Sequence, residues 1–251
     1  NRVGRMTIDK VLRKNRVLEA IVRTHVASAE PVGSKHIGRI LGLSSATIRG
    51  VMFELEREGL LRQPYTSAGR VPTDLGYRKY VDSMTGFSDM TELNLSDEMR
   101  RFLRGKRLFE EIIQGTAEAI SKITKYTAIA LSPNNRLYFD GTYHMLEQPE
   151  FMELSTAREF LRILEEREEL LELMSKDLER STSIHIGREN AFEELRSCTI
   201  ITSTYRVNDG IYGSIGVIGP MRMKYEEIVP TVETLAGMTR EFLEEMLYEQ
   251  G

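Results

Sequence analysis

Residues 30–73 read EPVGSKHIGRILGLSSATIRGVMFELEREGLLRQPYTSAGRVPT, and their pattern predicts the fold of the N-terminal part of the chain. It opens with Pro31-Val32-Gly33, which interrupts a helical repeat of apolar residues that runs from Ile8 to Ala27. Ser34 can cap a short helix that extends to Leu41. The sequence therefore predicts a long helix followed by a short one.

A second short helix follows a turn at Gly42. Either Ser44 or Ser45 can cap this helix, and Gly59 can end it in a left-handed conformation. Its buried face would consist of apolar residues at helical spacing, namely Ile48, Val51, Met52 and Leu55. Two helices joined by a short turn are typical of a helix-turn-helix motif.

A small β-hairpin comes next. Residues 60–62 form the first strand, residues 66–69 the tip, and Arg70-Val71 the returning strand, which Pro72 closes. A last helix opens at Thr73-Asp74. Helices followed by such a hairpin have the order of a winged helix-turn-helix, which we assign to residues 1–84.

The rest of the chain predicts a polar linker over residues 85–97 and an α+β domain over residues 98–251. Strand candidates are residues 126–131, 136–139, 183–186, 198–207 and 212–218, and helix candidates are residues 97–125, 155–177 and 226–249. Helices packed on antiparallel strands are typical of sensor-like domains.

The charge of the chain is divided unevenly between these two parts. Residues 1–84 hold 15 Lys and Arg against 8 Asp and Glu, whereas the remaining residues hold 19 against 30. A net charge of +7 on one part and −11 on the other indicates that the basic part meets a polyanion. Nucleic acid is the polyanion that a winged helix would bind.

The candidate DNA contacts lie on the second short helix and on the hairpin. Arg49 could make a bidentate contact to guanine, and Ser45 or Thr47 could bond a phosphate or a base edge. The tip has no acidic residue, so Thr66, Ser67 and Arg70 suit the sugar-phosphate backbone or the minor groove. We add Ser34 and Lys35 to this set. The alternative is a winged helix that binds protein and not DNA.

Other functions have weaker support in the sequence. The lone Cys198 and the scattered histidines give no metal-ligand spacing, so we expect no metal, no cofactor and no catalytic site. We find no signal peptide and no apolar run that could span a membrane, and the single thiol fits a reducing cytoplasm.

Several motifs resemble those of the bacterial heat-inducible transcription repressors of the HrcA family. They are EPVGSK at 30–35, SSATIR at 44–49, QPYTSAGRVPT at 63–73, LEQPEF at 146–151, IGREN at 186–190 and GSIGVIGPMRM at 213–223. The resemblance implies a repressor of chaperone operons that binds an inverted-repeat operator as a homodimer. It also implies a GAF-like C-terminal domain and a chaperonin that keeps the repressor active. A sensor domain that binds a small-molecule effector is the alternative form of regulation.

The chain departs from the family pattern in two places. Gly50 stands where the family usually has asparagine. The family also carries many tens of residues, including part of the GAF-like domain and an inserted dimerisation subdomain, where this chain passes directly from Pro133 to Asn134. Either the chain is a shortened variant, or a segment of a longer protein is absent here, and we favour the second interpretation.

Overall fold

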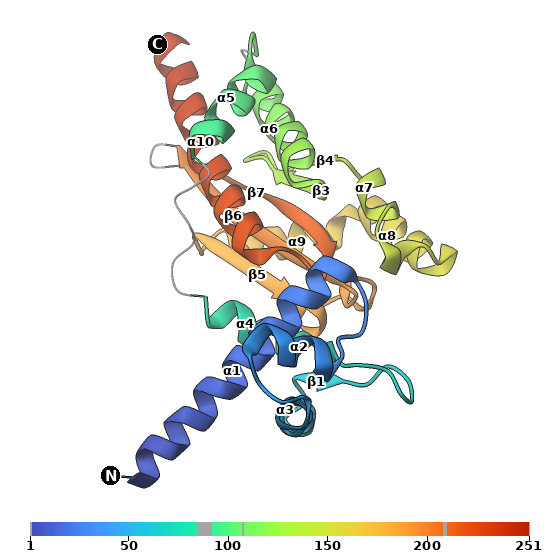
Figure 1. Cartoon of the computed structure of the whole chain (residues 1–251). Helices are drawn as coiled ribbons and strands as arrows, with labels where there is room; N and C mark the ends of the chain where they lie inside the picture. Colours follow the sequence, from blue (N-terminus) through green and yellow to red (C-terminus); the bar gives the residue numbers. More distant parts are fainter. Residues whose placement is uncertain (1, 85–91, 107, 208–209, 251) are drawn as a thin grey trace. The chain divides into compact units, whose positions relative to one another are not determined.

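The computed structural model (Figure 1) describes residues 2–84, 92–106, 108–207 and 210–250. The chain divides into two compact units, Asn1–Thr85 and Gly86–Gly251, which we call unit 1 and unit 2. Together they have the mixed helix-and-sheet composition that the sequence predicts. Within the described residues, no helix combines the length and the apolar character needed to cross a membrane.

Unit 1 consists of α1 (Arg2–Ser28), α2 (Ser34–Leu41), α3 (Ser45–Arg57), β1 (Leu61–Arg62), β2 (Val71–Pro72) and α4 (Asp74–Asp82). The long helix α1 packs against α2, α3, α4 and β2. The largest wholly buried side chains of this core are Ile21, Ile37, Ile48, Leu55, Leu61 and Tyr77. The buried face predicted for α3 is confirmed, since all four of its residues are buried.

The ends of the helices follow the predicted signals with one exception. Ser44 caps α3, because its hydroxyl accepts a hydrogen bond at 3.0 Å from the backbone N–H three residues further on. Gly42 and Gly59 adopt left-handed φ values of 66° and 74°. The prediction that Ser34 caps α2 is wrong. Gly33 holds the extended cap position without a side-chain bond, and Ser34 is the first helical residue.

The hairpin of unit 1 is joined by a single-residue β-bridge that the sequence did not reveal. β1 pairs with β2 in antiparallel fashion, and Val32 exchanges two backbone hydrogen bonds of 2.9 Å with Arg70. A Cβ atom on Gly69 would lie 2.4 Å from the carbonyl oxygen of Val32, so the close approach requires glycine here. A one-residue bridge has no periodicity, which is why residues 31–33 predicted only a helix break.

Unit 2 is built on a five-stranded antiparallel sheet with the order β4-β3-β7-β6-β5. Its strands are β3 (Thr127–Leu131), β4 (Leu137–Asp140), β5 (Thr182–Ile186), β6 (Cys198–Val207) and β7 (Ile211–Pro220). The five predicted strands are thus confirmed, with bounds that differ by at most two residues. Successive side chains of a strand point to opposite faces of the sheet, and buried side chains lie on both faces.

Helices cover both faces of this sheet (Figure 1). α6 and α10 pack on one face, and α5 packs against these two helices. α8 and α9 pack on the other face, where Phe160, Ile163 and Met174 meet Ile129 and Ile200 of the sheet. The α-helices are α5 (Glu92–Leu103), α6 (Phe109–Thr124), α7 (Tyr143–Leu146), α8 (Leu154–Glu165), α9 (Arg167–Asp177) and α10 (Tyr225–Gln250).

Three predicted segments of unit 2 are corrected by the structure. Residues 92–97, predicted as linker, belong to α5, while residues 85–91 of that linker lie outside the described residues. The long helix predicted over 97–125 is interrupted between α5 and α6, where Gly105 adopts a left-handed φ of 79°. The helix predicted over 155–177 breaks at Glu166, whose ψ of 67° lies outside the helical range.

Candidate nucleic-acid interface

The orientation of α3 is fixed by its buried face, and the opposite face is exposed. Ala46, Arg49, Gly50, Phe53 and Arg57 are exposed at the spacing of successive helical turns. This outer face carries two guanidinium groups and no acidic residue. It therefore has the charge and the small side chains near its N-terminus that entry into a DNA major groove requires.

The first turn of α3 has a polar character that comes from its cap. The Ser44 hydroxyl lies 2.8 Å from the hydroxyl of Thr47 and also accepts the backbone N–H of Thr47. Thr47 and Ser45, both predicted DNA contacts, are half-buried at this end of the helix. A helix N-terminus carries a partial positive charge, so this turn favours a phosphate group.

The acidic residues of α3 are all paired with cations. Lys10 of α1 lies 2.9 Å from Glu54, and its hydrogen bond is the main cause that lowers the pKa of that carboxyl group. Lys14 pairs in the same way with Glu58, directly after the helix. Arg49 and Arg57 make no hydrogen bond or ion pair with another described residue. The helix therefore offers free positive charge and compensated negative charge.

Arg70 has a different position from the one that its place in the hairpin predicts. Its Nη2 and Nε lie 2.9 Å and 3.1 Å from Oε2 of Glu56, and the two side chains are only 20% and 30% exposed. The pair joins the hairpin to α3. As placed, Arg70 therefore holds the two candidate DNA-binding elements together, and Glu56 supplies the acidic group that its guanidinium contacts.

The tip of the hairpin is open. Thr66 and Ser67 are exposed and make no side-chain hydrogen bond with other described residues, and Ser67 adopts a left-handed φ of 72°. The turn is closed by a hydrogen bond of 3.0 Å from the Ala68 N–H to the Tyr65 carbonyl. Tyr65, which the sequence reasoning did not single out, is 65% exposed beside the tip.

The remaining predicted residues lie at the start of α2. Lys35 is exposed and has no ion pair with another described residue, and Ser34 is half-buried. Because α2 packs against α3, the structure places Lys35 on the same pair of helices as Arg49. Ser45, Thr47 and Arg49 share one helix, whereas Ser34 and Lys35, on α2, and Thr66 and Ser67, at the hairpin tip, are separate groups.

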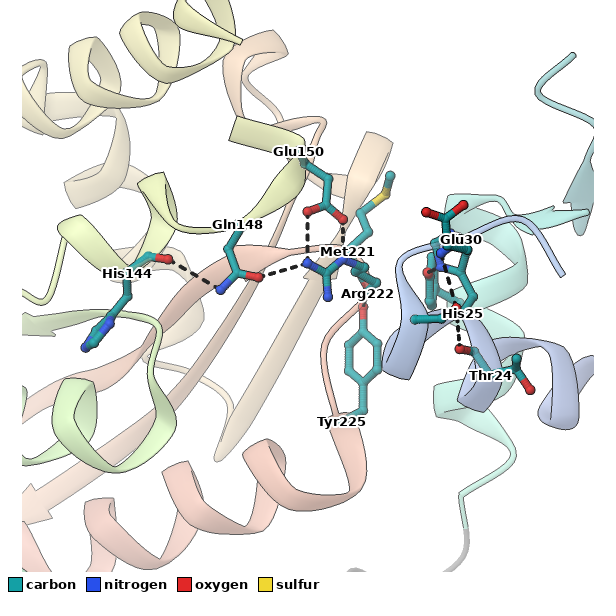
Figure 2. Close-up of polar contacts among 11 residues, drawn as sticks. Thr24, His25, Glu30, His144, Gln148, Glu150, Met221, Arg222 and Tyr225 are labelled. Atoms are coloured by element: carbon teal, nitrogen blue, oxygen red, sulfur yellow. Dashed lines mark hydrogen bonds and ion pairs between the residues drawn. The ribbon is translucent and has the colours of Figure 1, made fainter. Parts of the chain in front are cut away.

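Unit 2 contains a polar cluster that joins the segment after α7 to the segment after β7 (Figure 2). Arg222 donates to Glu150 through Nε at 2.5 Å and to Gln148 through Nη2 at 2.9 Å. Gln148 in turn donates to the carbonyl of His144 at 3.4 Å. Because its guanidinium faces a carboxylate of the same chain, this cluster packs two loops together and has the character of a structural contact.

Metal chemistry has no recognisable centre in the described part of unit 2. Among the described residues, no group of His, Cys, Asp or Glu could hold a metal ion. Cys198 is buried, and burial raises the pKa of its thiol to about 12. The thiolate is the nucleophilic form, so Cys198 is a core residue and a poor nucleophile.

Comparisons with known proteins relate this chain to one protein family. A family model described as the HrcA protein C terminal domain matches residues 130–229. The heat-inducible transcription repressor HrcA of Ruminiclostridium cellulolyticum is 30% identical, over 88% of this chain and 93% of the relative. The repressor of the same name from Symbiobacterium thermophilum is also 30% identical, over 90% of this chain and 96% of the relative.

A solved structure titled as that of a hypothetical protein matches 93% of this chain and 98% of its own with a TM-score of 0.80. At 18% identity, this likeness concerns the fold alone. The alignment with the Ruminiclostridium cellulolyticum repressor runs over 327 residues, more than the 251 of this chain. That relative therefore contains stretches that this chain lacks. In the structure, a tight turn with a 2.9 Å hydrogen bond from Ser132 to Arg136 joins β3 to β4. That the lacking stretch belongs at residues 133–134 stays a prediction.

Proposed function

The chain belongs to the HrcA family of heat-inducible transcription repressors, and we propose that it represses chaperone operons by binding an inverted-repeat operator through unit 1. We interpret unit 1 as a winged helix-turn-helix, in which α3 is the recognition helix and the β1–β2 hairpin is the wing. The outer face of α3 carries this proposal, because Arg49 and Arg57 are unpaired among the described residues while the acidic residues of the helix are paired.

In the proposed complex, α3 lies in the major groove with its N-terminal turn toward the bases. Arg49 contacts guanine, and Ser45 and Thr47 contact a phosphate or a base edge. Lys35 and Ser34 contact the phosphate backbone from α2, and Thr66 and Ser67 do so from the wing. Arg70 keeps the wing against α3 through Glu56, so its effect on DNA is one of positioning.

We propose that unit 2 is a GAF-like regulatory domain and takes part in forming the homodimer that an inverted repeat requires. The antiparallel sheet with helices on both faces supports the first part of this proposal. The net charge of −11 after residue 84 supports the assignment of DNA binding to unit 1 and not to unit 2, because an acidic surface repels DNA. The protein would act in the cytoplasm, where a bacterial chromosome lies.

Two modes of regulation are compatible with this role. By family resemblance, a chaperonin sustains the repressor, and its withdrawal on heat shock releases the operon. The alternative is a small-molecule effector. A hollow of about 610 Å³ beside β5, β6 and α10 is the observation that favours the alternative, because it is lined by charged groups of both signs, Arg180, Arg206, Arg240, Glu179 and Glu233, together with several hydroxyl groups.

The test is equilibrium binding of the whole chain to duplex DNA across a range of salt concentrations. Phosphate contacts by Lys35 and Arg57 from each of two protomers would give a slope of log K against log salt of about −4. A duplex selected from a random pool should bind at least about 1,000-fold more tightly than a scrambled one at physiological salt. Folded protein that binds no duplex at low salt would refute the proposal and favour a protein-binding winged helix.

A further inference from the structure

One large apolar side chain stands on the outer face of α3. Phe53 is 58% exposed, although its neighbours Val51, Met52 and Leu55 are buried in the core of unit 1. Its ring makes no aromatic or cation contact with another described residue. The core of unit 1 therefore does not account for a phenylalanine at this position.

The surface next to Phe53, toward the N-terminus of the helix, carries small residues that no other side chain covers. Gly50 lies one turn before it, and a Cβ atom there would meet nothing within 4 Å. Glycine within a helix costs roughly 1 kcal/mol relative to alanine, and here no contact inside unit 1 offsets that cost. With Ala46 also exposed, the backbone of α3 is open to close approach by another molecule beside a protruding ring.

The two exposed arginines indicate what that molecule is. Arg49 lies four residues before Phe53 and Arg57 four residues after it, so all three side chains share one stripe of the helix. A surface with cations at both ends and one ring between them is complementary to the edge of a DNA duplex. In the major groove, the C5-methyl group of thymine is the apolar feature that such a ring can contact.

We propose that Phe53 is a specificity-determining residue, which packs on the methyl group of a thymine in each half-site. This inference rests on the proposed function of unit 1. Four helical residues span about 6 Å, and successive bases along a strand are about 3.4 Å apart. The thymine therefore lies about two base pairs from the guanine that Arg49 contacts.

The experiment replaces single thymines by deoxyuridine, which lacks only the methyl group. The whole chain is used with a duplex selected by that chain from a random pool. Loss of one methyl group at the predicted position should weaken binding about three- to five-fold per half-site. The Phe53→Ala variant should bind the thymine duplex with a similar loss and should no longer distinguish deoxyuridine from thymine.

Two further variants keep the result interpretable. Phe53→Leu retains an apolar side chain and should keep part of the discrimination, even where Phe53→Ala binds too weakly to measure. Tyr248→Ala removes another exposed aromatic side chain, on α10 of unit 2, and should discriminate as the wild type does.

Two results would overturn the inference alone. In the first, replacement of any thymine by deoxyuridine leaves wild-type binding unchanged. In the second, Phe53→Ala distinguishes deoxyuridine from thymine as well as the wild type does, which would indicate that the Phe53 ring contacts a protein partner and not DNA. Failure of the wild type to bind any duplex would instead remove the proposed function, and the inference with it.

Discussion

Replacement of Arg49 is the most informative substitution in unit 1. Its guanidinium is exposed on α3 and has no hydrogen bond or ion pair within the described residues. Alanine suits a helix at least as well as arginine, so Arg49→Ala should change the free energy of unfolding by less than about 0.5 kcal/mol. Any large effect on DNA binding must therefore arise at the interface and not from unfolding.

The magnitude follows from the contact that the geometry allows. A bidentate arginine–guanine contact contributes about 1–3 kcal/mol of discrimination, which corresponds to roughly 5- to 150-fold in affinity for one half-site. A dimer on a symmetric operator loses this contribution twice. Arg49→Ala should therefore weaken binding to the selected operator by about 2–6 kcal/mol, and binding to scrambled DNA far less.

Arg49→Lys separates charge from geometry. Lysine keeps the positive charge but cannot form the planar two-bond contact, so this variant should keep nonspecific affinity and lose most of the preference for the operator. Fluorescence anisotropy with a labelled operator and a scrambled duplex measures both quantities. Arg158→Ala is the matched control, because Arg158 is an exposed arginine on α8 of unit 2 without a partner among the described residues.

Either of two results would show that Arg49 does not read a base. Arg49→Ala could bind operator and scrambled DNA as the wild type does, which would place α3 outside the groove. Alternatively, Arg49→Ala and Arg158→Ala could weaken binding equally, which would mean that net charge alone determines affinity.

The remaining predictions concern the hairpin, the separate units and the core thiol. In a double-mutant cycle, Arg70→Ala and Glu56→Gln should couple by about 0.5–1 kcal/mol in urea unfolding, and additive effects would show that the pair is not formed. A fragment of residues 1–85 should bind a palindromic operator much more weakly than the whole chain, and equal affinities would rule out unit 2 as the dimeriser. Residues 86–251 should show no DNA affinity, and sedimentation of the whole chain as a monomer at micromolar concentration would contradict the proposed dimer. Cys198 should resist alkylation until the protein unfolds. Because its folded pKa lies above its unfolded value of 9.0, stability should fall as pH rises above about 9, and a pH-independent unfolding free energy would contradict this.

Much of unit 1 could be predicted because its signals are local. The apolar face of α3 has helical periodicity, and Gly59 stands where a left-handed residue must follow the helix. The five strands of unit 2 were predictable for the same reason, since each is rich in β-branched, aromatic or aliphatic residues. Such patterns depend on neighbours along the chain and need no knowledge of the tertiary structure.

What the sequence did not reveal depends on contacts between distant residues. The bridge of Val32 to Arg70 and the ion pair of Arg70 with Glu56 join positions 38 and 14 residues apart. That Arg70 contacts DNA directly stays a prediction, made without knowledge of its ion pair with Glu56. The break at Glu166 is not marked by glycine or proline in the sequence, and the helices on both sides of it pack on one core.

We propose that this chain represses heat-shock genes by recognising an inverted repeat through unit 1. The decisive measurement is hydroxyl-radical footprinting of the whole chain on the promoters of its host's chaperone operons. We expect two protected segments related by two-fold symmetry, which fade between about 50 and 200 mM salt and are absent with Arg49→Ala. Folded protein that leaves these promoters unprotected at low salt, or that protects all DNA alike, would contradict this proposal.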